Sequence, residues 1–206
     1  MESKIGILNY GNGNHGSIQR MINKVGGQSS LINGPSELIK YRKIILPGVG
    51  NFSESVRLLH KHSLWEPLLK FTQSKEVSLM GICLGMQLLC KHSEEGNVDG
   101  LSLVDAKVEK FDFSYHESLK VPHMGWNTIR TIRPNTLLPM DNNERRFYFV
   151  HSYKVVPNDP RISIGQCDYG GEFCAAIQQD NILGVQFHPE KSHRFGMALI
   201  KNFVEL

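Results

Sequence analysis

The stretch VSLMGICLGMQLL, residues 77–89, decides the fold of this chain. Its first half is a short apolar run typical of a buried strand, and Gly81-Ile-Cys83-Leu-Gly85 follows without a break. Apolar residues then continue at helical spacing. A strand that turns sharply into a helix around G-x-C-x-G is the setting of a nucleophile elbow. We therefore expect Cys83 at the carboxyl edge of a sheet, in a strained backbone conformation for which the flanking glycines leave room.

The same order of strand, glycine-rich turn and helix occurs twice upstream of this stretch. Residues 4–9 form an apolar run, residues 10–14 are rich in glycine and asparagine, and residues 15–25 show helical spacing. Residues 43–46 lead in the same way into Pro47-Gly-Val-Gly50 and a helix expected from Ser53. Short apolar runs that alternate with helices predict a parallel, buried sheet.

The pattern changes after about residue 100. Short aromatic and β-branched runs predict antiparallel strands added to the sheet, at residues 146–151, 153–156, 173–178 and 182–187. A closing helix is expected over residues 193–204, with Phe195, Leu199, Ile200 and Phe203 on one face. There is no internal repeat or linker, so we expect one α/β domain over residues 1–206.

Bulk composition excludes several classes of protein. With 206 residues and 40% hydrophobic content the chain can bury one substantial core. A formal net charge of +3 is too mild to predict a nucleic-acid or membrane-surface partner. The N-terminus lacks the apolar region of a signal peptide, and no apolar stretch approaches about 18 residues. The four cysteines form no C-x-x-C pair, which fits a reducing cytoplasm and free thiols rather than a zinc ribbon.

Two interpretations of Cys83 remain open from the motif alone. At the start of a helix the partial positive charge and unpaired N–H groups favour a thiolate, which is the attacking species of a cysteine nucleophile. The alternative is a buried structural cysteine beside a glycine turn. Cys90, about two helical turns further on, is expected to pack in the core.

His188 is the best candidate for the general base among nine histidines. It ends a strand-like run, and active sites of open α/β sheets gather at strand ends. Pro189 keeps His188 out of the helical region, and in an extended segment Glu190 would project on the same side and accept from one imidazole nitrogen. An ordinary polar turn is the alternative. Without H-E-x-x-H or a comparable ligand set we predict no metal site and no cofactor.

Hydrolysis of an amide also needs donors for the negative charge that develops on the carbonyl oxygen. One backbone N–H is expected from Leu84, which follows the nucleophile. The glycine-rich turn at Pro47-Gly-Val-Gly50 could supply the second, because its glycines permit unusual backbone directions. The same turn could instead cradle a phosphate, but G-K-[ST] and a full G-x-G-x-x-G are both missing.

Seven segments together resemble class I glutamine amidotransferases and, more narrowly, the HisH family, the glutaminase subunits of imidazole glycerol phosphate synthase. They span nearly the whole chain: Tyr10-Gly-Asn-Gly-Asn14, Pro47-Gly-Val-Gly50, Gly81-Ile-Cys-Leu-Gly-Met-Gln87, Ser93-Glu-Glu-Gly96, Pro122-His-Met-Gly-Trp-Asn127, Tyr148-Phe-Val-His-Ser-Tyr153 and Gln186-Phe-His-Pro-Glu-Lys-Ser192.

The resemblance implies a flavodoxin-like amidotransferase fold and a Cys83-His188-Glu190 triad. It implies an oxyanion hole from the Val49 and Leu84 amides. A pocket for L-glutamine would be formed by Gly50, Gln87, Glu95, Ser152 and Tyr153, although Gln87 and Glu95 taken alone would be surface residues. An interface with a HisF-type cyclase subunit would contain Asn14, Trp126, Tyr148 and Lys191. The ammonia would pass to that subunit for formation of imidazole glycerol phosphate and AICAR in histidine biosynthesis.

The chain departs from the family pattern at a few places. Asn9 stands where aspartate is usual, and Asn51 follows Gly50 where alanine or histidine is common. Residues 14–18 and 191–197 resemble HisH paralogues that supply ammonia for amidination of surface-polysaccharide sugars. Further alternatives are another cysteine hydrolase or thiol redox protein on the same elbow, and a catalytically silent regulatory subunit.

Overall fold

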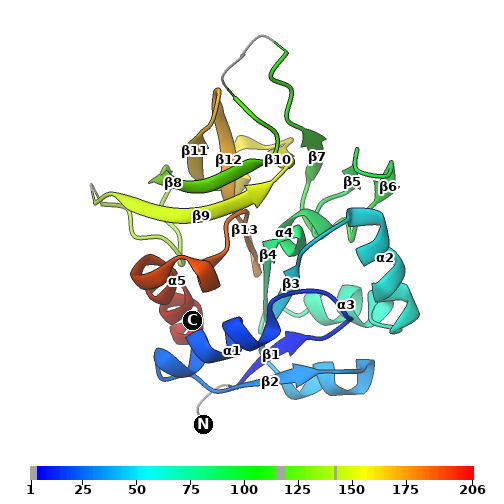
Figure 1. The fold of residues 1–206 in the computed structure, drawn as a ribbon. Helices are drawn as coiled ribbons and strands as arrows, with labels where there is room; N and C mark the ends of the chain where they lie inside the picture. The colour runs from blue at the N-terminus through cyan, green and yellow to red at the C-terminus, as the bar shows by residue number, and fades with distance from the viewer. Residues whose placement is uncertain (1–3, 115–118, 142) are drawn as a thin grey trace.

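The computed structural model describes residues 4–114, 119–141 and 143–206 (Figure 1). In these ranges one mixed sheet of thirteen strands is flanked by helices. In chain order the elements are β1 Ile5–Leu8, α1 His15–Lys24, β2 Ser29–Ile32, η1 Pro35–Lys40, β3 Lys43–Gly48, α2 Phe52–Lys61, α3 Trp65–Thr72, β4 Ser78–Cys83, α4 Leu84–Leu88, β5 His92–Ser93, β6 Val98–Asp99, β7 Ala106–Lys110, β8 His123–Thr131, β9 Arg145–His151, β10 Tyr153–Pro157, η2 Pro160–Ile162, β11 Ser163–Asp168, β12 Glu172–Gln179, β13 Ile182–Val185, η3 Pro189–Lys191 and α5 His193–Glu205.

The first half of the sheet is parallel, in the order β2-β1-β3-β4-β13. The register pairs Gly48 at the end of β3 with Cys83 at the end of β4. The Pro47-Gly-Val-Gly50 turn and the nucleophile elbow therefore leave the sheet side by side. The predicted fold class, a parallel α/β sheet with added antiparallel strands, is confirmed.

One strand direction in our sequence analysis was wrong. β13 was expected to be antiparallel, but it pairs in parallel with β4 and antiparallel only with β12. A tight turn at Asp180 and Asn181 reverses the chain after β12. β12 runs opposite to β4, so the strand that follows the turn runs in the same direction as β4 and pairs with the edge of β4.

The second half of the sheet is antiparallel apart from the short pairing of β5 with β7. It branches at β12, which pairs with β10, β11 and β13. From β11 the branch continues to the long hairpin of β8 and β9, where Trp126 lies opposite Tyr148. Residues far apart in sequence are thereby brought above the carboxyl ends of the parallel strands (Figure 1).

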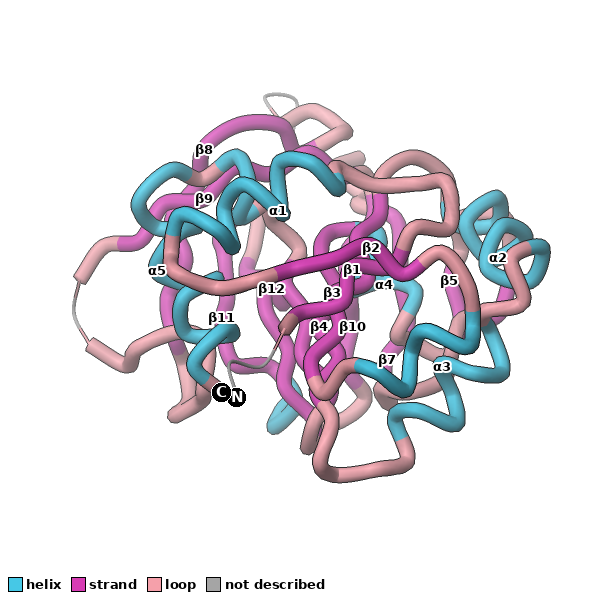
Figure 2. The backbone as a smooth tube through the Cα atoms, turned by 90° about the horizontal axis from the view of Figure 1, so that it is seen from below, coloured by secondary structure: helices cyan, strands magenta, loops and turns pink. Residues whose placement is uncertain are grey.

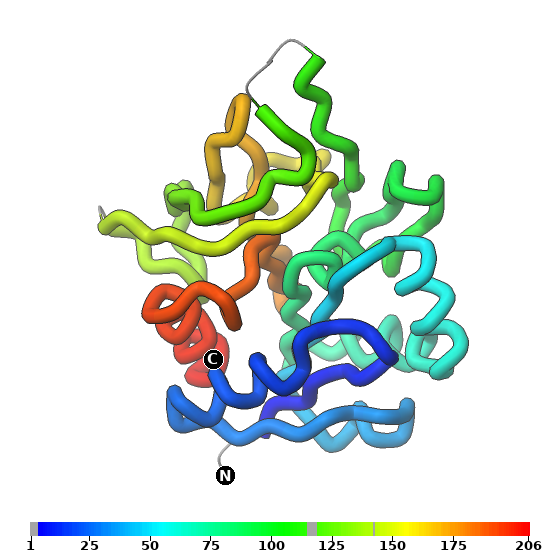
Figure 3. The backbone as a smooth tube through the Cα atoms, viewed as in Figure 1, coloured from blue at the N-terminus to red at the C-terminus, as the bar shows by residue number. Residues whose placement is uncertain are grey.

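Apolar side chains cover both faces of the parallel strands, and helices lie over each face (Figure 2). α1 and α5, from opposite ends of the chain, lie side by side and pack on one face (Figure 3). α2, α3 and η1 pack on the other. The alternation along β3, with Ile45 facing the first core and Ile44 and Leu46 the second, is the two-sided burial that a parallel strand needs.

The predicted helices α1, α2 and α5 are confirmed to within about one residue at most ends. The helical stretch expected around Met86, Leu88 and Leu89 is α4, which ends at Leu88. The strands β2, β5, β6, β7, β8 and β11 and the helix α3 were not predicted. In the described ranges no helix has both the length and the apolar character needed to cross a bilayer.

Candidate active site

Cys83 lies at the sharp turn between β4 and α4, with φ 54° and ψ −111°. Few residues with a side chain adopt this conformation, which marks a strained position. The flanking glycines are required by the backbone itself: a Cβ on Gly85 would lie 1.9 Å from the Leu46 oxygen, and one on Gly81 would lie 2.5 Å from the Gly85 oxygen. The elbow therefore packs directly against β3, which holds Cys83 at the carboxyl edge.

A cavity of about 350 Å³ opens beside Cys83. Ten of the residues singled out from the sequence line it: Val49, Gly50, Cys83, Leu84, Gln87, Glu95, Ser152, Tyr153, His188 and Lys191. Pro122, Val150 and His151 complete the lining. The volume is in the range of small-molecule pockets.

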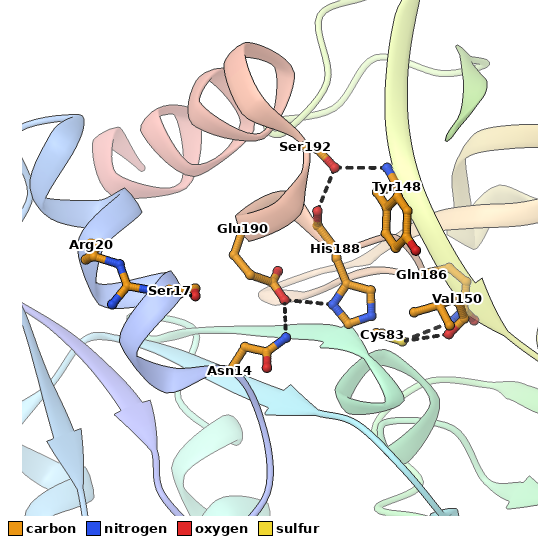
Figure 4. A network of polar contacts seen from close by, with 10 residues as sticks. All are labelled: Asn14, Ser17, Arg20, Cys83, Tyr148, Val150, Gln186, His188, Glu190 and Ser192. Carbon is orange, nitrogen blue, oxygen red and sulfur yellow. Dashed lines mark hydrogen bonds and ion pairs between the residues drawn. The ribbon is translucent and has the colours of Figure 1, made fainter. Parts of the chain in front are cut away.

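His188 lies between Cys83 and Glu190, as Figure 4 shows. Its Nδ1 is 2.7 Å from Oε1 of Glu190, and Asn14 Nδ2 donates to the same oxygen at 2.9 Å. The contact was expected, but its geometry was not: only His188 is extended, and Glu190 belongs to the 3-10 turn η3. Pro189 fits the first position of such a turn because its fixed φ suits it and its missing N–H would have no partner there.

Backbone contacts fix the position of His188. Its N–H donates to the Tyr148 carbonyl on β9, and its own carbonyl accepts from the Ser192 hydroxyl, which also receives the Tyr148 N–H. Nε2 of His188 has no hydrogen-bond partner among the described residues. The ring is thus anchored on the Glu190 side and open on the Cys83 side.

The charges of this group favour a protonated imidazole. Burial opposes charge on His188, but the neighbouring Cys83 and Glu190 outweigh it and raise the pKa of His188 to about 10. Burial likewise disfavours the Glu190 carboxylate, yet His188 and Asn14 together lower its pKa. The pair is buried, with side chains 1% and 2% exposed. It can therefore hold a proton next to Cys83 and return it.

The turn after β3 is held by the segment that follows β1. The Tyr10 hydroxyl donates to the Pro47 carbonyl at 2.7 Å, and Asn12 Nδ2 donates to the Val49 carbonyl and to Ser55 Oγ. Leu84 is the first residue of α4, where the N–H has no partner within the helix. Val49 and Leu84, whose backbone amides are the predicted oxyanion donors, both line the same cavity.

Hydrogen bonds to neighbouring residues hold the side chains of Gln87 and Glu95, which are predicted to bind glutamine. Gln87 is 4% exposed, so its interpretation as a surface residue was wrong; its Nε2 donates to the Tyr153 carbonyl at 3.1 Å and to Gln186 Oε1 at 3.0 Å. The Glu95 carboxylate accepts from the Phe52 N–H at the start of α2 and from Asn51 Nδ2. Asn51 also caps α2 through the Glu54 N–H, which gives this departure from the family pattern a structural purpose.

Comparison with known proteins agrees with the motifs. Residues 7–206 match the family described as "Glutamine amidotransferase class-I". Imidazole glycerol phosphate synthase subunit HisH 2 of Methanococcus maripaludis is 45% identical over 98% of both chains. HisH 2 of Pseudomonas aeruginosa is 43% identical over 97% of this chain and 98% of its own, and HisH of Leptospira interrogans 41% over 98% and 100%. The chain belongs to the HisH family of class I glutamine amidotransferases.

Solved structures share the fold at lower identity. PurLQS from Thermotoga maritima superposes with a TM-score of 0.74 at 17% identity, over 98% of this chain and 96% of that one. The crystal structure of a glutamine amidotransferase gives 0.72 at 16% identity, over 95% of this chain and 98% of that one. These likenesses support the class I amidotransferase fold.

Three of the four residues that the HisH resemblance places at a partner interface form one surface. Trp126 is 40% exposed, its ring lies 6.2 Å from that of Tyr148, and Lys191 Nζ lies 5.6 Å above the Tyr148 ring. His193 stacks on Trp126 at 5.4 Å. The fourth, Asn14, instead binds Glu190 from behind the histidine.

Sequence reasoning missed two buried polar residues of this site. Gln186 is fully buried and its Nε2 lies 3.8 Å from Cys83 Sγ, while His151 lines the cavity. A polar residue two positions before His188, inside an apolar run, was the available signal for Gln186. Across the described ranges no three metal-binding side chains come together.

Proposed function

We propose that this chain is the glutaminase subunit of a HisH-type imidazole glycerol phosphate synthase and that Cys83, His188 and Glu190 form its catalytic triad. One observation carries the proposal: a strained cysteine and an anchored histidine border one cavity, with a carboxylate on the far nitrogen of that histidine. This is the general arrangement of a nucleophile, its base and an orienting group.

The first half of the reaction forms a thioester. The Cys83 thiolate attacks the side-chain amide carbon of L-glutamine, and the negative charge on oxygen is accepted by the Val49 and Leu84 amides. The C–N bond breaks as the His188 imidazolium gives its proton to the departing nitrogen, which leaves as ammonia. The raised pKa of His188 supports this role because it keeps the proton available.

The second half releases glutamate. His188, now neutral, accepts a proton from water as the water attacks the thioester carbon. Cys83 leaves as a thiolate and His188 is again an imidazolium. Glu190 and Asn14 hold the ring in one orientation throughout. Gly50, Gln87, Glu95, Ser152 and Tyr153 would hold the amino acid end of the substrate, since all five border the cavity.

The ammonia would pass to a HisF-type cyclase for imidazole glycerol phosphate and AICAR formation. The surface of Trp126, Tyr148 and Lys191 is the proposed docking site, with Asn14 behind it. The names of the relatives favour this histidine-pathway role over a polysaccharide-linked paralogue or a silent regulatory subunit. We further propose that residues 1–206 act as one domain and work in the cytoplasm, where the four free cysteines would stay reduced.

Substitution of Cys83 tests the chemistry. Glutaminase activity should be measured for Cys83→Ser in the presence of a HisF-type cyclase, with Cys167→Ala as the matched control because Cys167 is a buried cysteine that does not line the cavity. We expect the first variant to be inactive and the control to stay active. Retained turnover by Cys83→Ser would remove Cys83 from the nucleophile role. Because the ammonia is proposed to pass directly to the cyclase, we also expect glutamine hydrolysis to depend on that partner, and full activity of the chain without any cyclase would contradict this coupling.

A further inference from the structure

Two buried histidines face each other across the β8–β9 hairpin, and one of them, His151, also lines the cavity. His123 and His151 are register partners, 3% and 6% exposed, and His123 Nδ1 lies 3.1 Å from His151 Nε2. The second nitrogen of each ring also has a partner: Nδ1 of His151 lies 2.7 Å from the Tyr153 carbonyl, and Nε2 of His123 lies 3.3 Å from Asn127 Nδ2. Neither ring takes part in the proposed acyl transfer.

The Tyr153 end fixes the tautomer of His151. A carbonyl oxygen only accepts, so Nδ1 of His151 must carry the hydrogen. In a neutral ring Nε2 is then the acceptor, and Nδ1 of His123 must donate to it. His123 in turn has an unprotonated Nε2 that can only accept.

The contacts of Asn127 lead independently to the same donor-to-acceptor direction, from Asn127 through His123 to His151. Oδ1 of Asn127 accepts from the Thr128 N–H at 2.8 Å, and its Nδ2 donates to the Asp168 carbonyl at 2.9 Å. These two contacts determine which side-chain atom is nitrogen, although the two look alike in shape. Nδ2 therefore donates to His123 Nε2, and every bond from Asn127 to Tyr153 points towards the cavity.

The surroundings keep both rings neutral. His123 stacks between Tyr169 at 4.0 Å and Phe149 at 4.7 Å, and Phe111 and Phe173 flank His151 at 5.3 Å. Burial in this aromatic layer lowers the pKa of His123 to about 4 and that of His151 to about 3. A second proton on His151 would also put two hydrogens between the rings, and one on His123 would face the Asn127 amide hydrogens.

The chain of contacts continues beneath the substrate cavity. The Tyr153 carbonyl accepts from Gln87 as well as from His151, Gln87 donates to Gln186, and Gln186 Nε2 approaches Cys83 Sγ at 3.8 Å. The carbonyl of Tyr153 is thus the point where the histidine pair meets the two glutamines. Its orientation fixes the Tyr153–Lys154 peptide and thereby the backbone at Tyr153, a residue that borders the cavity.

We propose that His123 and His151 are positioning residues for glutamine, joined in a one-way hydrogen-bond chain from Asn127 that fixes the Tyr153 carbonyl. This deepens the proposed function and rests on it. The pair acts on substrate binding through the backbone, whereas Cys83 and His188 act on the bonds that break. Because Asn127 follows Trp126 on β8, the chain also links the proposed docking strand to the floor of the cavity.

Nitrogen NMR of the histidine rings tests the direction of the chain. In the wild-type chain both rings should be neutral from pH 5 to pH 8 in the Nδ1–H tautomer, which is the minor form of free histidine. An Nε2–H tautomer for either ring, or protonation of either ring within this range, would overturn the proposal. This readout does not depend on glutaminase activity.

Kinetics test the positioning role, in the complex with a HisF-type cyclase. His151→Phe keeps an aromatic ring but loses the donor, so KM for glutamine should rise about tenfold, the factor for one ordinary hydrogen bond, with kcat within about threefold. His151→Asn retains a nitrogen at the Nδ1 position and should restore most of the loss. Phe173→Leu, which alters the same aromatic layer without a hydrogen bond, should leave KM unchanged.

Other outcomes count against the proposal. Three results would each show that the two histidines only pack in the core: a fall in kcat equal to the rise in KM, no rescue by His151→Asn, or the same change in Phe173→Leu. Labelling of Cys83 separates failure of the inference from failure of the proposed function. If a glutamine-like chloroketone and iodoacetamide label wild type equally well and no glutaminase activity appears, the proposed function fails and the inference with it. If wild type prefers the chloroketone and His151→Phe keeps that preference, only the inference fails.

Discussion

Asn14 and Glu190 are separated by 176 positions in the sequence, yet the Asn14 side chain donates a 2.9 Å hydrogen bond to the Glu190 oxygen that also contacts His188 (Figure 4). The segment before α1 therefore reaches the far side of the candidate triad. A carboxylate that receives two hydrogen bonds has less freedom to rotate away from the imidazole.

Asn14→Ala should lower kcat about tenfold, the lower end for a lost hydrogen bond to a charged group. The Michaelis constant for glutamine should change little, because Asn14 does not line the cavity. Steady-state glutaminase assays of the complex measure both constants. Ser17→Ala is the matched control on α1, since the Ser17 hydroxyl contacts only Arg20 among the side chains shown in Figure 4. An unchanged kcat for Asn14→Ala would show that Glu190 needs no second partner.

Glu190→Gln should change the pH dependence of the reaction. The pKa of His188 is raised to about 10 because Cys83 and Glu190 outweigh burial, and removal of the carboxylate takes away one of these interactions. The imidazolium then loses its proton at lower pH, so the high-pH decline of kcat should move to lower pH. The maximum of kcat should fall about 100-fold, as for impaired general acid catalysis.

Full pH–rate profiles of wild type and Glu190→Gln check this prediction. Asp99→Asn provides the control, because Asp99 contacts His92 at 2.8 Å on the surface, away from the cavity. The profile of the control should match that of wild type. A high-pH limb that stays in place in Glu190→Gln would mean that Glu190 does not set the proton affinity of His188.

Gly85→Ala should destabilise the whole fold. The added Cβ would meet the Leu46 carbonyl at 1.9 Å, and neither atom belongs to a flexible side chain. We expect a loss of about 3 kcal/mol or more and a fall in Tm of about 6–12 °C, at 2–4 °C per kcal/mol for a chain of this size. Thermal unfolding should leave Gly34→Ala near wild type, since nothing lies within 4 Å of its added Cβ. Equal Tm values for the two variants would contradict the close packing of the elbow on β3.

Trp126→Ala should weaken binding of the cyclase partner. Its ring stacks on His193 and meets Tyr148 edge-on, so it forms a rigid and partly exposed aromatic anchor. Calorimetric titration should show a loss of about 2 kcal/mol or more, typical of a central aromatic contact. Ile39→Ala removes a more exposed apolar side chain on η1 and should not affect binding. Equal affinities of wild type and Trp126→Ala would place the interface elsewhere.

Local sequence determined the elbow, the parallel sheet and the helices α1, α2 and α5. In each case the information lies within a few residues: the glycines around Cys83 for the turn, and the spacing of apolar residues for strands and helices. The contact of His188 with Glu190 was also predictable because the two residues are only two positions apart. Its 3-10 geometry was not, because a proline permits either an extended or a turned continuation.

Only the tertiary structure decided what surrounds these elements. The direction of β13, the burial of Gln87 and the approach of Gln186 to Cys83 depend on contacts between segments about a hundred residues apart. The bond from Asn14 to Glu190 and the facing of His123 and His151 depend on how separate strands and helices are brought together. Such contacts have no local pattern in the sequence, because the same polar side chain is a surface residue or a buried donor according to what packs against it. The candidate reacting groups, Cys83, His188 and Glu190, could be identified from the sequence. Their orientation depends on how the β8–β9 hairpin and α1 pack over the sheet.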